Sequence, residues 1–266
     1  MNRRSLHTLR PASLPLPGVL LLMMLGGCGT THRSLEHAPS TVDEQTRPDF
    51  MVAFQRTLQR DMATAIAGSL IGPIDLHITL DRRNALLGCK ASRPRPTTMR
   101  AFPATLMPSS YKDLAEAVER QCWKSIYPQV PAALHEADGT IEVIAPLIMM
   151  PSPASQALDQ RWRLNYAQRE FFWQQLLLDH PVHSIGKAVI HFQADARGKV
   201  ESCLVNLIPT AARPDAFEPD GNLQALLITR CKGLDLRQLP GFTLDALGKA
   251  QGSVSVEYAP WKTSRR

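Results

Sequence analysis

The chain has 266 residues, of which 44% are hydrophobic and 20% charged, so it is long enough for one or two globular domains with cores of their own. Its formal net charge is +6, but Arg3, Arg4 and Arg10 lie in an N-terminal segment that we expect to be removed, which leaves +3. Such a small excess does not favour a nucleic-acid-binding protein, and we expect no nucleic-acid partner.

The first residues have the features of an export signal. After the basic residues, residues 14–25 form an apolar run that is too short to span a bilayer as a helix. The run ends in Leu25-Gly26-Gly27-Cys28, which resembles the bacterial lipoprotein signal, in which a peptidase cuts before the cysteine and its thiol is acylated. We therefore predict a lipoprotein signal peptide over residues 1–27 and lipidation of Cys28. Because Gly29 follows, resemblance to proteobacterial sorting implies anchoring at the periplasmic face of the outer membrane. The alternative is an ordinary secretory signal with an incidental Cys28.

Residues 28–47 are mostly polar and show no periodicity, so we expect a flexible tether between the anchor and the folded part. A coil of this length reaches about 25 Å, because its end-to-end distance is about 5–6 Å times the square root of its length. The folded part should therefore lie close to the membrane.

After the tether, Pro48 and Asp49 favour the start of a helix, in which apolar residues recur every fourth position from Phe50 to Ile66.

The segment over residues 74–89 occurs twice. It aligns without a gap on residues 188–203, at an offset of 114 residues (188 − 74). In both copies apolar and polar residues alternate, as in a half-buried antiparallel strand, and Asn84 and Gly198 occupy the same turn position. Asn and Gly tolerate a positive φ, so both copies can close a short hairpin. A self-match at a fixed offset predicts tandem domains.

Similar elements surround each hairpin. A helix is expected before it and a second helix after a long loop, and a strand closes each unit. The fold class is therefore α+β, with two tandem small domains, each helix–β-hairpin–helix–β with an antiparallel sheet. The expected helices cover residues 48–70, 111–123, 155–179 and 222–231, the loops 92–110 and 208–221, and the closing strands 140–145 and 253–259. The first repeat would span residues 48–146, a linker 147–154, and the second repeat 155–262.

Four cysteines remain once Cys28 carries lipid, and four cysteines in an exported chain suggest two disulfides. Each copy has one cysteine that ends the hairpin and one on the following helix, so the repeat predicts the pairs Cys89–Cys122 and Cys203–Cys231. Each bridge would add about 3–4 kcal/mol in the chain-entropy model. Free buried cysteines are the alternative, whereas a zinc site is not supported because no Cys-x-x-Cys spacing occurs.

The second hairpin carries a resemblance to a known family. Gly186, the turn from Asp195 to Gly198, and Cys203 on the second strand are similar to the opening hairpin of the TonB C-terminal domain family, in a variant with another cysteine on the following helix. Pro240 and the closing strand also match. The family's Ser-Gly and Leu-Asp signature between hairpin and helix is absent, as are its Pro-rich arm and uncleaved N-terminal membrane helix. A lipid-anchored protein could not couple to an inner-membrane motor as the energy-transducing members do.

What the resemblance implies is binding of an extended protein or peptide segment beside a sheet edge. An edge strand offers unpaired backbone N–H and C=O groups to an added strand. The candidate edges are residues 140–145 and 253–259, and the expected partner-binding residues are Ser253, Val254, Ser255, Val256, Glu257 and Tyr258. The expected partner is an envelope protein or peptide segment. The alternative is that these edges are covered and that the chain is a structural or assembly lipoprotein of an envelope or secretion complex.

Chemistry-bearing residues form no recognisable catalytic motif. His77 and His191 lie on the strand face opposite the core, and the aspartate four residues after each lies about 13 Å away, too far for a dyad. His180 and His183 could ligate a metal, but no acidic third ligand is near them in the sequence. Serine hydrolase, zinc protease and P-loop motifs are absent. We therefore predict a non-enzymatic protein with no catalytic residues, no metal and no cofactor.

Overall fold

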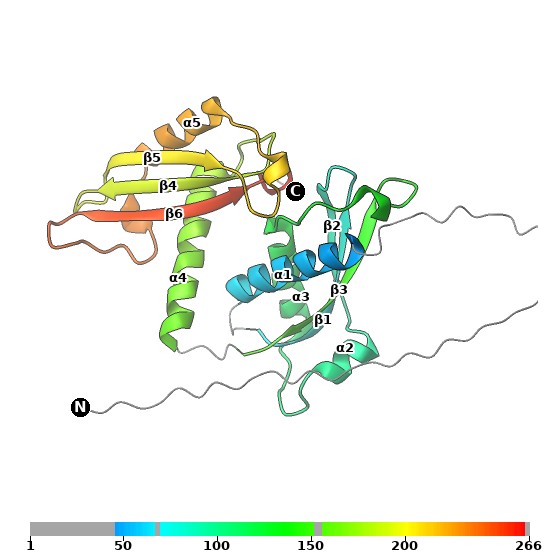
Figure 1. The fold of residues 1–266 in the computed structure, drawn as a ribbon. Helices are drawn as coiled ribbons and strands as arrows, with labels where there is room; N and C mark the ends of the chain where they lie inside the picture. The colour runs from blue at the N-terminus through cyan, green and yellow to red at the C-terminus, as the bar shows by residue number, and fades with distance from the viewer. Residues whose placement is uncertain (1–45, 67–69, 152–155, 264–266) are drawn as a thin grey trace, which may run out of the picture. The chain divides into compact units, whose positions relative to one another are not determined.

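The structure is a computed structural model that describes residues 46–66, 70–151 and 156–263 (Figure 1). The predicted signal peptide, Cys28 and almost all of the tether lie outside these residues. The described elements form an α+β fold with two separate three-stranded antiparallel sheets, which confirms the predicted fold class. Within the described residues, no helix combines the length and hydrophobicity that a membrane span requires.

The first repeat builds its sheet in the order β2-β1-β3. Its central strand β1 pairs antiparallel with both neighbours, so the hairpin and the closing strand form one sheet. The elements are α1 (Thr46–Ile66), β1 (Gly72–Leu80), β2 (Leu86–Ser92), α2 (Pro96–Ala101), α3 (Tyr111–Lys124), the 3-10 helix η1 (Ala132–Leu134) and β3 (Ile141–Met149).

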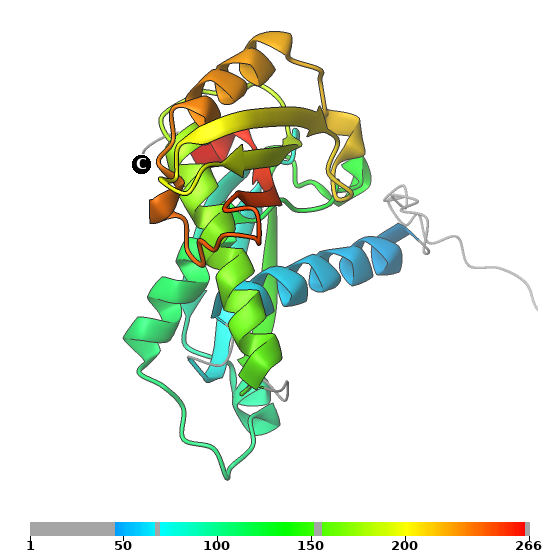
Figure 2. The same ribbon diagram turned by 90° about the vertical axis from the view of Figure 1, so that its left-hand side faces the viewer.

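The second repeat has the equivalent order β5-β4-β6. Its elements are α4 (Gln156–Phe172), the π-helical turn η2 (Trp173–Leu177), β4 (Gly186–Ala194), β5 (Val200–Ile208), the 3-10 helix η3 (Pro214–Ala216), α5 (Gly221–Lys232), the 3-10 helix η4 (Leu236–Gln238), β6 (Ala250–Tyr258) and α6 (Pro260–Thr263). In Figure 2, α5 (orange) lies along the sheet beside the yellow strands, in agreement with its packing on β5.

The two hairpins share their backbone details. Each has a register shift at the same position before the turn, between Thr79 and Leu80 and between Gln193 and Ala194. Asn84 has a φ of 59° and Gly198 a φ of 76°, so both copies use a left-handed residue where the sequence predicts one. The aspartate that opens each turn accepts hydrogen bonds from two backbone N–H groups of its own turn. The repeat is therefore a repeat of backbone geometry as well as of sequence.

Each sheet covers a hydrophobic core of its own. In the first core the apolar stripe of α1, with Phe54, Leu58 and Met62, packs with the inward residues of β1 and with α3. The ring of Phe54 stacks on Tyr127 with centroids 4.8 Å apart. Ala188, Ile190, Phe192 and Ala194 of β4 are buried in the second core, as their alternation predicts. Trp261 of α6 packs into the first core, so the C-terminal residues contact the first repeat.

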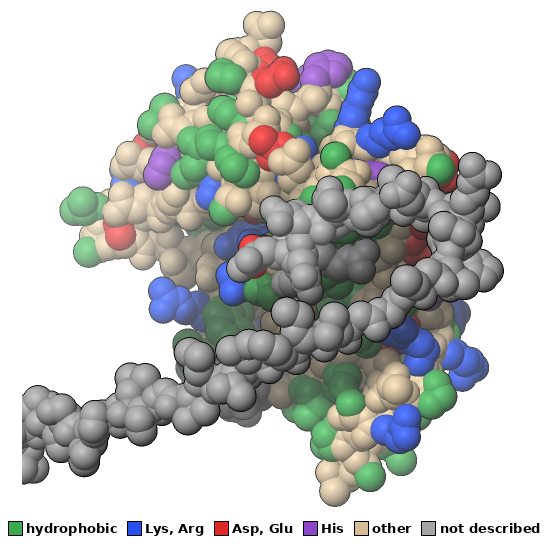
Figure 3. All heavy atoms as spheres, turned by 45° about the vertical axis from the view of Figure 1, so that its right-hand side comes forward, with side chains coloured by type: hydrophobic (Ala, Val, Ile, Leu, Met, Phe, Trp, Pro, Cys, Tyr) green, Lys and Arg blue, Asp and Glu red, His purple; other side chains and the backbone are tan. Residues whose placement is uncertain are grey.

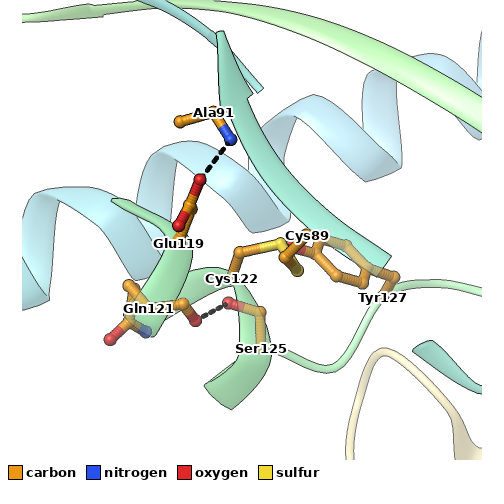
Figure 4. The surroundings of a disulfide bond; sticks show 7 residues. All are labelled: Cys89, Ala91, Glu119, Gln121, Cys122, Ser125 and Tyr127. Atoms are coloured by element: carbon orange, nitrogen blue, oxygen red, sulfur yellow. Dashed lines mark hydrogen bonds between the residues drawn. A yellow bond between two sulfur atoms is a disulfide. The ribbon is translucent and has the colours of Figure 1, made fainter. Parts of the chain in front are cut away.

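The cysteines pair as the repeat predicts. Cys89–Cys122 joins β2 to α3, and Cys203–Cys231 joins β5 to α5, with Cα atoms 6.0 and 6.2 Å apart. Figure 4 shows the first bridge beside Tyr127, whose hydroxyl donates to Sγ of Cys122 at 3.3 Å. Glu119 on the same helix accepts from the backbone N–H of Ala91 on β2 at 2.7 Å. Helix and strand are thus joined by a covalent bond and by a charge-assisted hydrogen bond.

The loop predicted over residues 92–110 contains a short helix, α2, which the sequence reading missed. Pro96 suits the first position of this helix. The segment covers part of the outer face of the first sheet and buries Asp75, whose side chain is 1% exposed. That carboxylate accepts hydrogen bonds from the backbone N–H and the Nε of Arg95 and from Oγ1 of Thr98. Asp75 therefore faces away from the core, as the alternation indicates, without being exposed.

Several element boundaries also differ from the prediction, including the start of β6 at Ala250, three residues before the predicted start at 253. Strand β3 continues through Pro146 to Met149, three residues into the segment predicted as a linker, and every residue of the strand pairs with β1. Proline is tolerated there because β3 is an outer strand. The helix predicted to end at residue 179 ends earlier, as α4 gives way to η2.

Candidate functional site

The two predicted edges, β3 and β6, are both outer strands of their sheets. The opposite outer strands, β2 and β5, are joined by disulfides to helices that pack on them. A hollow lies at each of the predicted edges: an apolar groove at β3 and a polar pocket at β6. These two hollows are the candidate sites.

The apolar groove lies between α1 and β3, with Trp162 of α4 at its side, and has a volume of about 840 Å³. None of the described residues that line it is charged. The lining consists of Met51, Phe54, Gln55, Leu58, Gln59, Met62 and Ala63 of α1, residues 143–151, and Trp162. Several of these apolar side chains remain open to solvent, including Ile144 (41% exposed) and Trp162 (44%). A contiguous apolar surface of this kind is typical of an interaction site.

Pro146 indicates which backbone groups face the open side of β3. A proline nitrogen carries no hydrogen, so Pro146 fits the strand without losing a ladder bond only if its nitrogen points away from β1. Backbone groups alternate in direction along a strand, so Glu142, Ile144 and Ile148 then direct their N–H and C=O groups to the free edge. The edge therefore offers hydrogen-bonding groups on both sides of Pro146, beside an apolar groove.

The six residues predicted as the partner-binding edge lie on β6, but most of them are not open. Val254, Val256 and Tyr258 are buried in the second core. Ser255 and Glu257 are half-buried and line the polar pocket, and only Ser253 is exposed. Helix α4 packs near this strand. The alternation along β6 thus divides the predicted residues between a core and a pocket.

The polar pocket has a volume of about 370 Å³ and is lined by α1, α3, α4, η2, β4, β6 and α6. Two of its ion pairs are short: Arg60 with Asp61 at 2.8 Å, and Lys124 with Glu170 at 2.7 Å. Lys262 donates to the backbone carbonyl of Glu257 at 2.7 Å. The five basic residues of the lining are Arg60, Lys124, Arg169, Lys187 and Lys262, and the three acidic ones are Asp61, Glu170 and Glu257.

Burial lowers the pKa of the Lys262 ammonium to about 8, although the carboxylates of Glu257 and Asp61 act in the opposite direction. The indole N–H of Trp173, another lining residue, is buried and has no acceptor among the residues that the structure describes. A buried donor without an acceptor costs free energy. The pocket thus combines an excess of positive charge with donors whose hydrogen-bonding capacity is not filled by protein groups.

A hydrogen-bonded chain of polar side chains crosses the outer face of the first sheet. Nε2 of His77 lies 3.1 Å from Oγ of Ser92, and its Nδ1 lies 2.8 Å from Oε1 of Glu142. This serine–histidine–carboxylate order is found at nucleophilic active sites. Here the side chains of His77 and Glu142 are 30% and 51% exposed, and none of the three residues lines the groove or the pocket. These hydrogen bonds link side chains from all three strands of the sheet.

The described residues of the second repeat do not form an equivalent row of hydrogen-bonded side chains. His191 is exposed, and the positions equivalent to Ser92 and Glu142 hold Asn206 and Gln251. The sequence reading compared each histidine only with the aspartate on its own strand, and therefore missed partners on neighbouring strands. The register of the closing strand would have been needed to find them.

Neither the charges on the face seen in Figure 3 nor the metal-ligating residues of the described part of the chain indicate a further site. On the face seen in Figure 3, lysine and arginine side chains are scattered between apolar and neutral ones and do not form one continuous patch. Within the parts of the chain that the structure describes, no group of three or more His, Cys, Asp or Glu residues could hold a metal ion, and His180 and His183 belong to no such group.

Comparisons with protein-family models, with curated proteins and with solved structures find no match, so the resemblance to the TonB C-terminal domain family stays a prediction.

Proposed function

We propose that this protein is a non-enzymatic lipoprotein of the cell envelope that binds an extended, uncharged and apolar segment of a protein partner beside strand β3. The observation that carries the proposal is the apolar groove, because it runs along an outer strand and none of its described lining residues is charged. Of the two edges predicted from the sequence, the edge at β3 is the better candidate, since most of the β6 residues are buried or line the polar pocket.

Strand addition supplies the affinity and the groove supplies the selectivity. A segment of four or five residues beside β3 could form about three or four backbone hydrogen bonds, each worth about 0.5–1.5 kcal/mol net. Its alternate side chains would enter the groove against Phe54, Leu58 and Met62. A charged side chain would be disfavoured there, because none of the described lining residues carries a charge that could pair with it.

The compartment follows from the sequence signal. Lipidation at Cys28 would place the protein on the periplasmic face of the outer membrane, and the tether would keep the groove within about 25 Å of the lipid surface. A partner in the same compartment, such as an unfolded stretch of another envelope protein, is then the natural source of an apolar segment.

Site-specific photo-crosslinking in intact cells tests the proposal. A photoreactive residue is placed at Ile144 or Gln59, which line the groove on opposite sides, in the full-length chain. Matched positions are Leu204, which is 51% exposed on β5, and Ser253 on β6. We expect adducts of the same mass at the two groove positions. Synthetic peptides that tile the recovered partner should then compete for the crosslink, and the competing peptide should be uncharged and apolar.

Other outcomes reject the groove as the site. Adducts at Ser253 alone would assign binding to the β6 edge instead. Adducts at Leu204 with none in the groove would support the assembly-lipoprotein alternative. Replacing Ile144 by proline provides a further check, because it removes one N–H from the free edge and leaves the bonds to β1 in place. This variant should lose the adduct at Gln59, whereas Ile144→Ala should keep it.

A further inference from the structure

The polar pocket carries an inference that goes beyond, and does not depend on, the proposed binding at β3. We propose that it is a binding site for a small organic dianion, such as a dicarboxylate or a phosphate monoester. The pocket is distinct from the apolar groove, with which it shares no lining residue.

The first argument is the charge of the lining. Among the described residues, five basic and three acidic ones line the pocket, so this part of the lining has a formal charge of +2. Two of the carboxylates, those of Asp61 and Glu170, already form short ion pairs with Arg60 and Lys124. A dianion would balance the remaining positive charge, whereas a cation or a neutral ligand would not.

The second argument is the capacity of the donors. The Lys262 ammonium has three hydrogens, and its one hydrogen bond found within the described residues goes to the carbonyl of Glu257. The buried indole N–H of Trp173 has no acceptor within the described part of the chain. An oxyanion presents acceptors only, and hydrogen bonds between charged groups are among the strongest in proteins. The ligand chemistry that suits these donors is therefore an oxygen-rich anion.

The third argument is size. A volume of about 370 Å³ is at the small end of the range of ligand sites, so it would hold a metabolite-sized molecule rather than a peptide. The ring of Trp173, with the Lys124 ammonium 5.7 Å from its centroid, and the side chain of Tyr166 form part of the wall. The carbon skeleton of a small dianion could lie against these rings.

Isothermal titration calorimetry on the lipidated full chain in detergent micelles tests the proposal. The probes are succinate and glycerol 3-phosphate, which distinguish carboxylate from phosphate, with acetate as a monoanion. We expect at least one dianion to bind and acetate to bind at least tenfold more weakly. The Lys262→Met variant should weaken binding of that dianion about tenfold or more, whereas Lys90→Met, at an exposed lysine outside the pocket, should not change it.

Two further variants should change the affinity for the dianion in opposite directions. Glu257→Gln removes a negative charge from the lining and should tighten binding several-fold. Trp173→Phe removes only the indole N–H and should weaken binding several-fold. Its matched control is Trp261→Phe, because the Trp261 indole N–H is also buried without an acceptor but does not line the pocket.

The pH dependence has a defined direction. The pocket groups that act on Lys262 are Glu257, Asp61, Lys124 and Glu170, and its pKa of about 8 means that the ammonium loses its proton as the pH rises through 8. Affinity for the dianion should therefore fall between pH 7 and pH 9. Absence of binding by both dianions would overturn the proposal, as would a Lys262→Met variant with unchanged affinity or equal losses in the Trp173→Phe and Trp261→Phe variants.

Discussion

The turn that is shared by the two hairpins offers a sharp test of how the sequence relates to the structure. Asn84 and Gly198 occupy the same turn position and both have a positive φ, so their backbone conformations alone would allow either residue at either turn. The contacts around the two residues indicate that they are not interchangeable. Oδ1 of Asn84 accepts a hydrogen bond from the backbone N–H of Val130 at 2.7 Å, and Asn84 is buried. At Gly198, a Cβ atom would lie only 2.7 Å from the backbone N of Arg237.

The perturbation is the replacement Gly198→Asn. The left-handed conformation itself is tolerated by asparagine, so the cost comes from crowding. The new Cβ would also lie 2.6 Å from Cγ of Arg237 and 2.8 Å from a carboxylate oxygen of Asp235. Because backbone is among the crowded atoms, η4 must shift, and this shift weakens the hydrogen bond from Leu236 N–H to the Gly198 carbonyl. Overpacking and the weakened bond together should cost about 3 kcal/mol.

The matched control is Gly248→Asn. Gly248 has a φ of 70°, and a Cβ atom there would meet nothing within 4 Å. This replacement has the same backbone demand without the crowding, so it should change the free energy of unfolding by less than about 1 kcal/mol. The reciprocal replacement Asn84→Gly keeps the backbone conformation but leaves the buried N–H of Val130 without an acceptor, which should cost about 1–3 kcal/mol.

The assay is urea denaturation of the oxidised protein, followed by tryptophan fluorescence and by far-ultraviolet circular dichroism. The midpoint shift multiplied by the slope gives the change in the free energy of unfolding. If Gly198→Asn and Gly248→Asn shift the midpoint equally, crowding at Arg237 does not explain the glycine, and the reasoning is wrong.

Three further predictions concern the bridges, the groove and the enzyme question. Replacing both Cys203 and Cys231 by alanine removes a bridge that spans 28 residues, and should lower the free energy of unfolding by about 3–4 kcal/mol in oxidising urea titrations; an unchanged midpoint would contradict the entropic argument. Gln59→Glu adds a charge to the uncharged groove at nearly constant shape, so it should weaken binding of an apolar peptide about tenfold or more by fluorescence anisotropy, with unchanged thermal stability; retained affinity would place the peptide elsewhere. A fluorophosphonate probe should not label Ser92, because none of Ser92, His77 and Glu142 lines the groove or the pocket; labelling that disappears in a His77→Gln variant would refute the non-enzymatic assignment.

Much of each repeat could be predicted from the sequence, because the signals are local. Alternation over residues 74–80 and 188–194 indicates which face of each strand is buried. This signal does not depend on where the strand lies in the sheet. The repeat offset assigns the disulfides, since one cysteine ends each hairpin and one lies on the next helix. Asn84 and Gly198 specify a left-handed turn residue within a few positions of chain. These features depend on short-range stereochemistry and on spacing.

Other features were decided only by the tertiary structure. The sequence predicted two edges and favoured β6, but the polar pocket at β6 and the apolar groove at β3 depend on where α1 and α4 pack, which no spacing specifies. The side chains that cover Asp75 and the partners of His77 come from segments 15 to 65 residues away. The polar pocket combines side chains of seven elements. Local patterns specify the shape of each repeat, whereas the hollows between packed elements arise from contacts between residues that are distant in the chain.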